Sequence, residues 1–204
     1  MARGAKRIAV AAATVLALLA ACRGGNDKLL PTATVPTAPE TTTTTLPYAV
    51  PPVIDAAYVN RVIDGLDAIT GDANRLVVET RTTPREVFDR MRAIYARDED
   101  VDLRLKDFAN AVSRGLPYVK PNPGNRKSVV REILSSSPNC IYVRVNRDYS
   151  SLAFGAATDT TEWIAIRPLD RARDPYGLNP TGWAYVFEGF ISDRGRPERD
   201  PCLA

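Results

Sequence analysis

The chain has 204 residues, of which 27 are Lys or Arg, 24 are Asp or Glu and none is His. Its formal charge of +3 equals that of Arg3, Lys6 and Arg7, the only charged residues among the first 21, so the rest of the chain is neutral overall. A neutral chain gives no electrostatic reason to bind nucleic acid. The lack of histidine excludes Ser-His-Asp and Cys-His catalytic arrangements and nearly all catalytic zinc sites. We therefore expect neither a cofactor nor a metal.

The start of the chain has the layout of a bacterial lipoprotein signal. After the basic residues, about fourteen small or apolar residues lead to Leu19-Ala20-Ala21-Cys22. A membrane-spanning helix needs about 20 apolar residues, more than this run provides. The pattern predicts a signal peptide over residues 1–21 and acyl chains such as palmitate on Cys22. The protein would then be anchored by lipid at the extracytoplasmic face of the cell membrane. A cytoplasmic protein with an apolar N-terminus is the weaker alternative.

Residues 22–52 are rich in Thr and Pro, include the run Thr41–Thr45, and contain almost nothing that could form a core. This composition predicts a disordered tether that lifts the rest of the chain off the membrane. Threonine beside proline also suits O-linked glycosylation, and the sequence leaves this open against an unmodified linker.

Besides Cys22 the chain holds two cysteines, Cys140 and Cys202. An even pair in an exported chain predicts a disulfide, because the compartment outside the cytoplasm is oxidising. Closing a loop of about 60 residues would stabilise the fold by on the order of 4 kcal/mol in the chain-entropy model. Two free buried thiols are the alternative.

Helical patterns open the folded domain that we expect over residues 53–204. Asp55 is placed to cap a helix whose apolar residues recur from Ala56 to Ile69, with Gly71 at its end. The next segment, Ala73–Thr80, fits either a helix or a short strand.

Two more helices are expected before the chain changes its pattern. Thr83-Pro84-Arg85-Glu86 predicts a helix start in which Thr83 is the cap and Glu86 closes a capping box. A further helix is expected over about Asp102–Arg114, followed by a surface loop over Tyr118–Asn125.

From Pro138 onward the apolar period becomes two, which predicts strands. Ile141, Val143 and Val145 would face one way, and Asn146-Arg147-Asp148 would form a turn.

Two further strands are expected over Thr160–Arg167 and Gly182–Ile191, and in the first of them Glu162 falls on the same face as Ile164. Ser128–Ser137 fits a helix or a strand. Helices followed by antiparallel strands predict an α+β fold with N-terminal helices packed on a curved C-terminal sheet.

The signal at Leu19-Ala20-Ala21-Cys22 and the Thr/Pro tether resemble those of small cell-surface lipoproteins of high-GC Gram-positive bacteria. The order of elements over residues 53–200 is similar to the cone-shaped fold of nuclear transport factor two and the related polyketide-cyclase and ketosteroid-isomerase proteins. That second resemblance implies a sheet wrapped around the first helix, with a pocket inside the cone.

Asp148 and Tyr149 are the candidate acid-base pair, because a buried Asp can act as a base and a Tyr can hold an enolate. A turn at the end of a strand explains the same two residues. The acidic segment Asp98–Asp102 resembles the start of a calcium loop, but Leu103 stands where the glycine of such a loop belongs. Helix capping and solvation explain this segment better.

A ligand pocket is a second candidate site. Tyr176, in the long loop Pro168–Thr181, and Trp183 and Tyr185 of the last strand could line it together with Asp148 and Tyr149. Packing of the aromatic residues in the core is the alternative.

These features predict a non-catalytic binding or assembly module of the cell envelope. Its partners would be the membrane, through Cys22, and an envelope protein or a small apolar ligand. One alternative is a cone-fold enzyme that uses an Asp/Tyr pair on a small apolar substrate, and another is a structural spacer.

Overall fold

The structure is a computed structural model and describes residues 48–190 and 199–203. The chain divides into two units, Met1–Thr42 and Thr43–Ala204, and all described residues belong to the second. The expected signal peptide, Cys22 and the tether up to residue 47 lie outside the described residues. Tyr48, near the end of the expected tether, packs against the core.

In the described residues three α-helices precede four strands, which confirms the α+β class with N-terminal helices. Within the described ranges, no helix is both long and apolar enough to cross a membrane. The elements are α1 (Ala56–Thr80), α2 (Arg85–Ile94), α3 (Asp98–Ser113), β1 (Lys127–Ser137), β2 (Cys140–Asp148), β3 (Thr160–Pro168), the short 3-10 helix η1 (Arg171–Arg173) and β4 (Trp183–Phe190).

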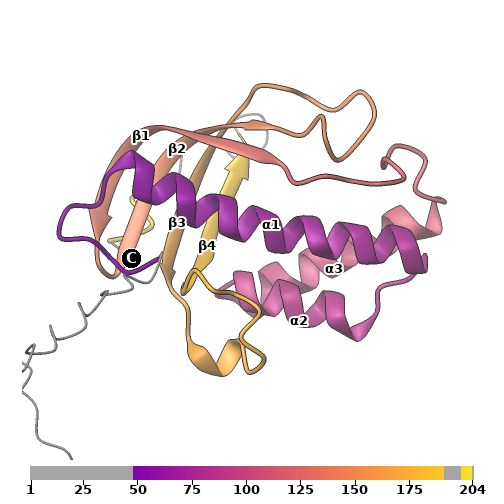
Figure 1. Cartoon of the computed structure of the whole chain (residues 1–204), viewed down its shortest axis with the longest axis horizontal. Coiled ribbons are helices and arrows are strands. Elements are labelled where there is room, and N and C mark those ends of the chain that lie inside the picture. The colour runs from indigo at the N-terminus through magenta and orange to yellow at the C-terminus, as the bar shows by residue number, and fades with distance from the viewer. Residues whose placement is uncertain (1–47, 191–198, 204) are drawn as a thin grey trace, which may run out of the picture. The chain divides into compact units, whose positions relative to one another are not determined.

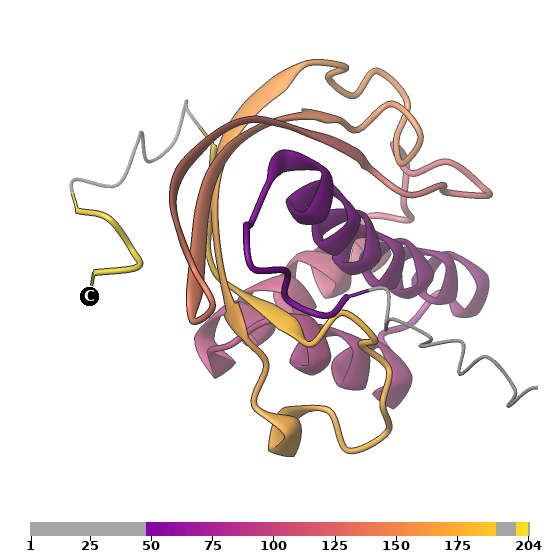
Figure 2. The same cartoon turned by 60° about the vertical axis from the view of Figure 1, so that its left-hand side comes forward.

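The strands form one antiparallel sheet in the order β1-β2-β3-β4. The sheet is curved and curls around α1, which lies along its inner face (Figure 2), with α2 and α3 below α1 in Figure 1. We call the face toward α1 the inner face and the opposite one the outer face. The core lies between the helices and the inner face and includes Val62, Leu66, Met91, Val143 and Ile164.

Helix α1 begins as expected, because the Asp55 side chain accepts a hydrogen bond from the Tyr58 amide at 2.7 Å. It does not end at Gly71, and Ala73–Thr80 continues the same helix. A side chain at position 71 would overlap Asn125, so this glycine lets the chain ahead of β1 lie close against α1. Gly71 therefore serves packing, and the expected helix end there is wrong.

The expected capping box at the start of α2 is also wrong. The helix begins at Arg85, and its N-cap is Pro84, which makes no side-chain cap hydrogen bond.

Helix α3 starts earlier than expected, at Asp98 rather than Asp102. Asp98, Glu99 and Asp100 occupy its first turn, where the helix dipole favours negative charge. The acidic segment is thus explained by the start of a helix.

Ser128–Ser137, which fitted a helix or a strand, is part of strand β1. Strand β2 continues to Asp148, so the expected turn at Asn146-Arg147-Asp148 is wrong. These three residues pair with β1, with Ser128 opposite Arg147. Pairing on both sides of β2 outweighs the local preference of Asn and Asp for turns. As a result, Arg147 lies on the inner face, two residues beyond Val145.

A β-bulge in β4 changes which side chains share a face. Ala165 pairs with Phe187 while the next residue, Ile166, pairs with Tyr185, so Val186 is the extra residue. A simple alternation would put Tyr185 and Glu188 on opposite faces. The bulge brings both to the inner face, because Glu188 pairs with the inward-facing Ile164.

The expected disulfide is present and joins Cys140 to Cys202, 62 residues apart in sequence, with their Cα atoms 5.5 Å apart. Cys140 lies on the outer face, since its neighbour Ile141 points into the core. The bridge holds the C-terminal segment, residues 199–203, on the side of the sheet away from α1 (Figure 2). Arg167 of β3 adds a hydrogen bond of 3.0 Å to the Pro201 carbonyl.

Candidate functional site

The two members of the candidate acid-base pair, Asp148 and Tyr149, bind different partners. The Asp148 carboxylate accepts a hydrogen bond from the Ser150 amide at 2.7 Å, and its bonds to Ser150 lower its pKa. The Tyr149 hydroxyl instead donates to Glu162. Asp148 therefore belongs to a turn after β2, while Tyr149 contacts the interior of the fold.

The other three candidate pocket residues also lie in different places. Tyr176 is 68% exposed on its loop. Trp183 is buried in the core and donates from its indole nitrogen to the Tyr58 hydroxyl at 2.9 Å. Tyr185 is fully buried and joins a group of polar side chains on the inner face.

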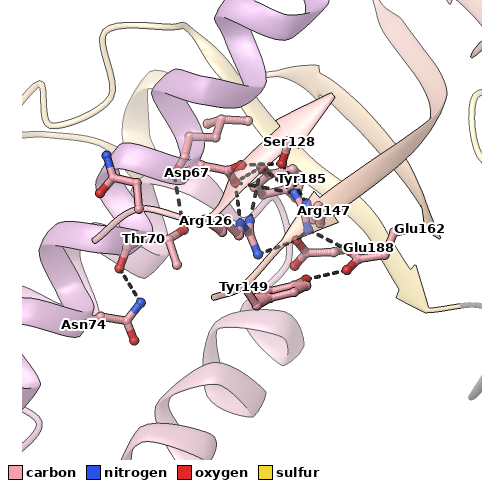
Figure 3. A network of polar contacts seen from close by, with 12 residues as sticks. Asp67, Thr70, Asn74, Arg126, Ser128, Arg147, Tyr149, Glu162, Tyr185 and Glu188 are labelled. Atoms are coloured by element: carbon pink, nitrogen blue, oxygen red, sulfur yellow. Dashed lines mark hydrogen bonds and ion pairs between the residues drawn. The ribbon is translucent and has the colours of Figure 1, made fainter. Parts of the chain in front are cut away.

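That group, which we call the charge network, occupies the space between the sheet and α1 (Figure 3). It contains three arginines and three carboxylates, so its formal charges cancel, and four hydroxyl groups complete its hydrogen bonds. Its members are Asp67, Arg104, Arg126, Arg147, Glu162 and Glu188, with the hydroxyls of Tyr95, Ser128, Tyr149 and Tyr185.

Arg147 of β2 is the central cation of the charge network. Its side chain is fully buried, and it binds Glu188 of β4, Glu162 of β3 at 2.8 Å and Asp67 of α1 at 3.5 Å. Its Nε also donates to the hydroxyl of Ser128 on β1 at 3.0 Å. One guanidinium thus connects all four strands and the first helix.

Asp67 is the only member of the charge network from α1. Its side chain is 1% exposed and forms an ion pair with Arg126, which lies just ahead of β1. It also accepts from Ser128 at 2.6 Å and from the Tyr185 hydroxyl at 3.1 Å. Gly71 lets the segment that carries Arg126 lie close against α1.

Glu188 binds the largest number of cations in the charge network. In addition to Arg147, it pairs with Arg126 at 2.9 Å and with Arg104 of α3 at 2.6 Å. The Tyr95 hydroxyl donates to it at 2.9 Å. Because the bulge at Val186 turns Glu188 inward, the network reaches α3 at this point.

Burial and ion pairing pull the pKa values of the two glutamates in opposite directions. Burial raises the pKa of Glu162, and its arginine and tyrosine neighbours offset only part of that rise. Burial alone would raise the pKa of Glu188 too, but Arg126, Arg147 and Arg104 together lower it well below its ordinary value. Glu188 is therefore firmly ionised, whereas the raised pKa of Glu162 makes it easier to protonate than an ordinary glutamate.

Aromatic faces complete the surroundings of the arginines. The guanidinium carbons of Arg126 and Arg147 lie 5.6 and 5.8 Å from the centre of the Tyr185 ring. Removing charges from water is costly, and the cost is offset only when each charge has good partners. Since each charged member has such a partner, the network favours one fixed arrangement of strands and helix.

A small cavity of about 160 Å³ borders the charge network. Tyr95, Arg104 and Arg126 line one side of it, and Thr70 and Asn74 of α1 line another. Pockets that bind metabolites or drugs usually measure about 300 to 1,000 Å³, so this cavity suits a few waters rather than an organic substrate.

The combination of a carboxylate with a raised pKa and a tyrosine is chemically notable, because such pairs serve as acids and bases in enzymes. Here it is Glu162 with Tyr149, not Asp148 with Tyr149. Glu162 is fully buried and does not line the 160 Å³ cavity. In the part of the chain that the structure describes, no group of three or more Cys, Asp or Glu is arranged to hold a metal ion.

The two-residue period places Glu162 on an apolar strand face, but it does not identify the charge network. The sequence carries one signal of this network: several elements have a charged residue at a position that faces inward. Asp67 follows Leu66 on the apolar side of α1, and Arg147 continues the inward series that ends with Val145.

A larger hollow lies elsewhere, at the outer side of β4, and we call it the outer groove. It has a volume of about 680 Å³. Its walls come from the α2–α3 link, the loop between β3 and β4, and the C-terminal segment. Its residues include Arg97, Arg167, Asp170, Arg173, Phe187, Arg199 and Pro201.

Comparisons of this chain with protein-family models, with curated proteins and with solved structures found no match.

If the charge network holds the fold together, removing Arg147 should be costly. In Arg147→Met, three buried carboxylates lose a partner, and we expect the free energy of unfolding to fall by about 3–5 kcal/mol. Urea denaturation followed by circular dichroism measures this loss.

Arg144→Met is the matched control on the same strand. The Arg144 side chain is 45% exposed and pairs with Glu132 at 3.3 Å, so its loss should cost at most about 1 kcal/mol. Equal losses of unfolding free energy in the two variants would show that the buried ion pairs do not dominate the stability of the fold.

The lowered pKa of Glu188 predicts a specific dependence of stability on pH. The unfolded chain binds a proton at Glu188 near the ordinary value of 4.5, whereas the folded chain resists protonation. The stabilisation is therefore complete above pH 4.5 and is lost as the pH falls below it. The raised pKa of Glu162 acts in the opposite sense, because it lowers stability as the pH rises above 4.5.

Urea denaturation between pH 3 and 7 checks this dependence. Glu188→Gln should be less stable at pH 7 and should lose less stability than the native chain below pH 4.5. If the free energy of unfolding changed with pH in the same way in both proteins, Glu188 would not be the residue responsible for the loss of stability in acid.

Proposed function

We propose that the chain is a lipid-anchored, extracytoplasmic binding or assembly module of the cell envelope that acts without catalysis. The observation that carries this proposal is the contrast between the two sides of the sheet. The charge network occupies the inner side and its charged groups are paired with one another, while the larger hollow lies on the outer side. Contact with a partner is thus best supported at the outer surface.

The proposed location rests on the sequence and on the disulfide. Leu19-Ala20-Ala21-Cys22 has the pattern of a lipid-attachment site. The bridge between Cys140 and Cys202 fits an oxidising compartment, since disulfides rarely persist in the cytoplasm.

The Glu162–Tyr149 contact supports the second candidate, a cone-fold enzyme. An enzyme needs its acid or base within hydrogen-bond reach of a substrate. The carboxylate of Glu162 has no exposed surface and is already bound by the hydroxyl of Tyr149 and the guanidinium of Arg147. The binding module therefore agrees better with the geometry.

Intact mass spectrometry of the membrane-extracted protein tests the proposed location. We expect loss of residues 1–21, added acyl mass on Cys22, and alkylation of Cys140 and Cys202 only after reduction. The variant Cys22→Ala is the control and should remain unacylated and leave the membrane fraction. An unprocessed chain whose thiols react without reductant would overturn both the anchor and the oxidising setting.

A further inference from the structure

We propose that the outer groove binds an acidic, extended segment of a partner polypeptide, and that the Cys140–Cys202 disulfide holds one wall of this site. The inference rests on the proposed function as a binding module and states the chemistry of the partner. It is carried by the charge of the rim, the apolar floor and the attachment of the C-terminal segment.

The rim of the outer groove is rich in arginine. Arg97, Arg167, Arg173 and Arg199 line it, and among the described lining residues Asp170 is the single carboxylate. The planar guanidinium group can form two parallel hydrogen bonds with one carboxylate, which makes arginine well suited to acidic ligands. The charge of the rim therefore favours an anionic partner.

Arg97 and Arg173 have acidic neighbours just outside the groove. Arg97 donates two hydrogen bonds to Asp100, at 2.8 and 2.9 Å, and its side chain is 56% exposed. Arg173 is more buried: its side chain is 15% exposed, it contacts the exposed Asp98 at 2.8 Å, and its Nε donates to the Tyr95 carbonyl at 3.0 Å. An exposed pair such as Arg97–Asp100 contributes about 0–1 kcal/mol, so a carboxylate of a ligand can replace it at little cost.

The floor of the outer groove is apolar. Ala184, Val186 and Phe187 of β4 form it, with Pro168 and Pro201 at its sides. A ligand that carries only charge would leave this floor uncovered. In an extended polypeptide, successive side chains point to opposite sides, so one residue type can meet the floor while its neighbours reach the rim. Acidic residues that alternate with apolar ones fit both features.

The C-terminal segment supplies the remaining wall. Arg199 and Pro201 face the groove, and the next residue, Cys202, is tied to β2 by the disulfide. The hydrogen bond from Arg167 to the Pro201 carbonyl fixes the same segment to β3. Reduction of the bridge would release this wall, so binding should depend on the oxidised state.

Two blocked pentapeptides test the ligand chemistry, Ac-ELELE-amide and its neutral counterpart Ac-QLQLQ-amide. Isothermal titration calorimetry with the oxidised full chain should show binding of the acidic peptide and at least about tenfold weaker binding of the neutral one, a ratio of the size that one charge-assisted contact provides. Absence of acidic-peptide binding, or equal affinity for both peptides, would overturn the proposal.

Substitution at the rim tests the position of the site. Arg199→Met should weaken binding of the acidic peptide by about tenfold, whereas Arg144→Met, which removes an exposed arginine outside the groove, should leave it unchanged. Equal effects of the two substitutions would show that binding is non-specific charge attraction and would contradict a site in the groove.

The role of the disulfide is tested with the variant Cys140→Ser/Cys202→Ser. Affinity for the acidic peptide should fall while the far-ultraviolet circular dichroism spectrum remains that of the folded chain. Unchanged affinity in a folded variant would show that the disulfide does not hold a wall of the binding site. If the variant does not fold, Arg199→Met still decides whether the C-terminal segment contributes to binding.

These outcomes are separable from the proposed location. The mass measurement on Cys22 and the two bridge cysteines does not depend on the outer groove. A correctly anchored chain that does not bind the acidic peptide would overturn the groove proposal alone.

Discussion

The fold depends on one buried cation, the guanidinium of Arg147. It contacts carboxylates from α1, β3 and β4, and it reaches a hydroxyl on β1 from its own strand β2. A buried charge without partners would be strongly unfavourable, so these elements must meet in the observed arrangement for the charge to be tolerated. The curvature of the sheet (Figure 2) and the bulge before Glu188 both bring partners to this point.

This constraint also bears on where the molecule can act. A curved sheet that wraps a helix can enclose a substrate, but here paired charges occupy that space and leave a cavity of about 160 Å³. The inner side therefore serves stability. The outer side combines an arginine rim with an apolar floor, and a disulfide places the end of the described chain beside it. Binding at that surface is our proposal for the protein's role.

The order of elements could be predicted because helical and two-residue periodicities are local properties of the sequence. The disulfide could be predicted because Cys140 and Cys202 are an even pair in a chain with an export signal. The errors had non-local causes. The neighbours of Arg147 favour a turn, whereas pairing with β1 and β3 decides its conformation. A glycine such as Gly71 is typical of a helix end, but here its small size allows contact with a distant segment. Glu188 faces inward only because of a bulge, which strict alternation cannot anticipate. The charge network joins residues far apart in sequence, so local patterns showed only single members such as Glu162.

The most direct test of this view is the hydrogen exchange of the arginine Nε–H groups in the native protein, measured by NMR. In a closed network, the Nε–H groups of Arg126 and Arg147, which donate to Asp67 and Ser128, should exchange far more slowly than that of the half-exposed Arg144. Exchange of all three at the same rate would show that water reaches the inner side freely. The space between the sheet and α1 would then be open to a ligand, which would contradict a purely structural role for the charge network.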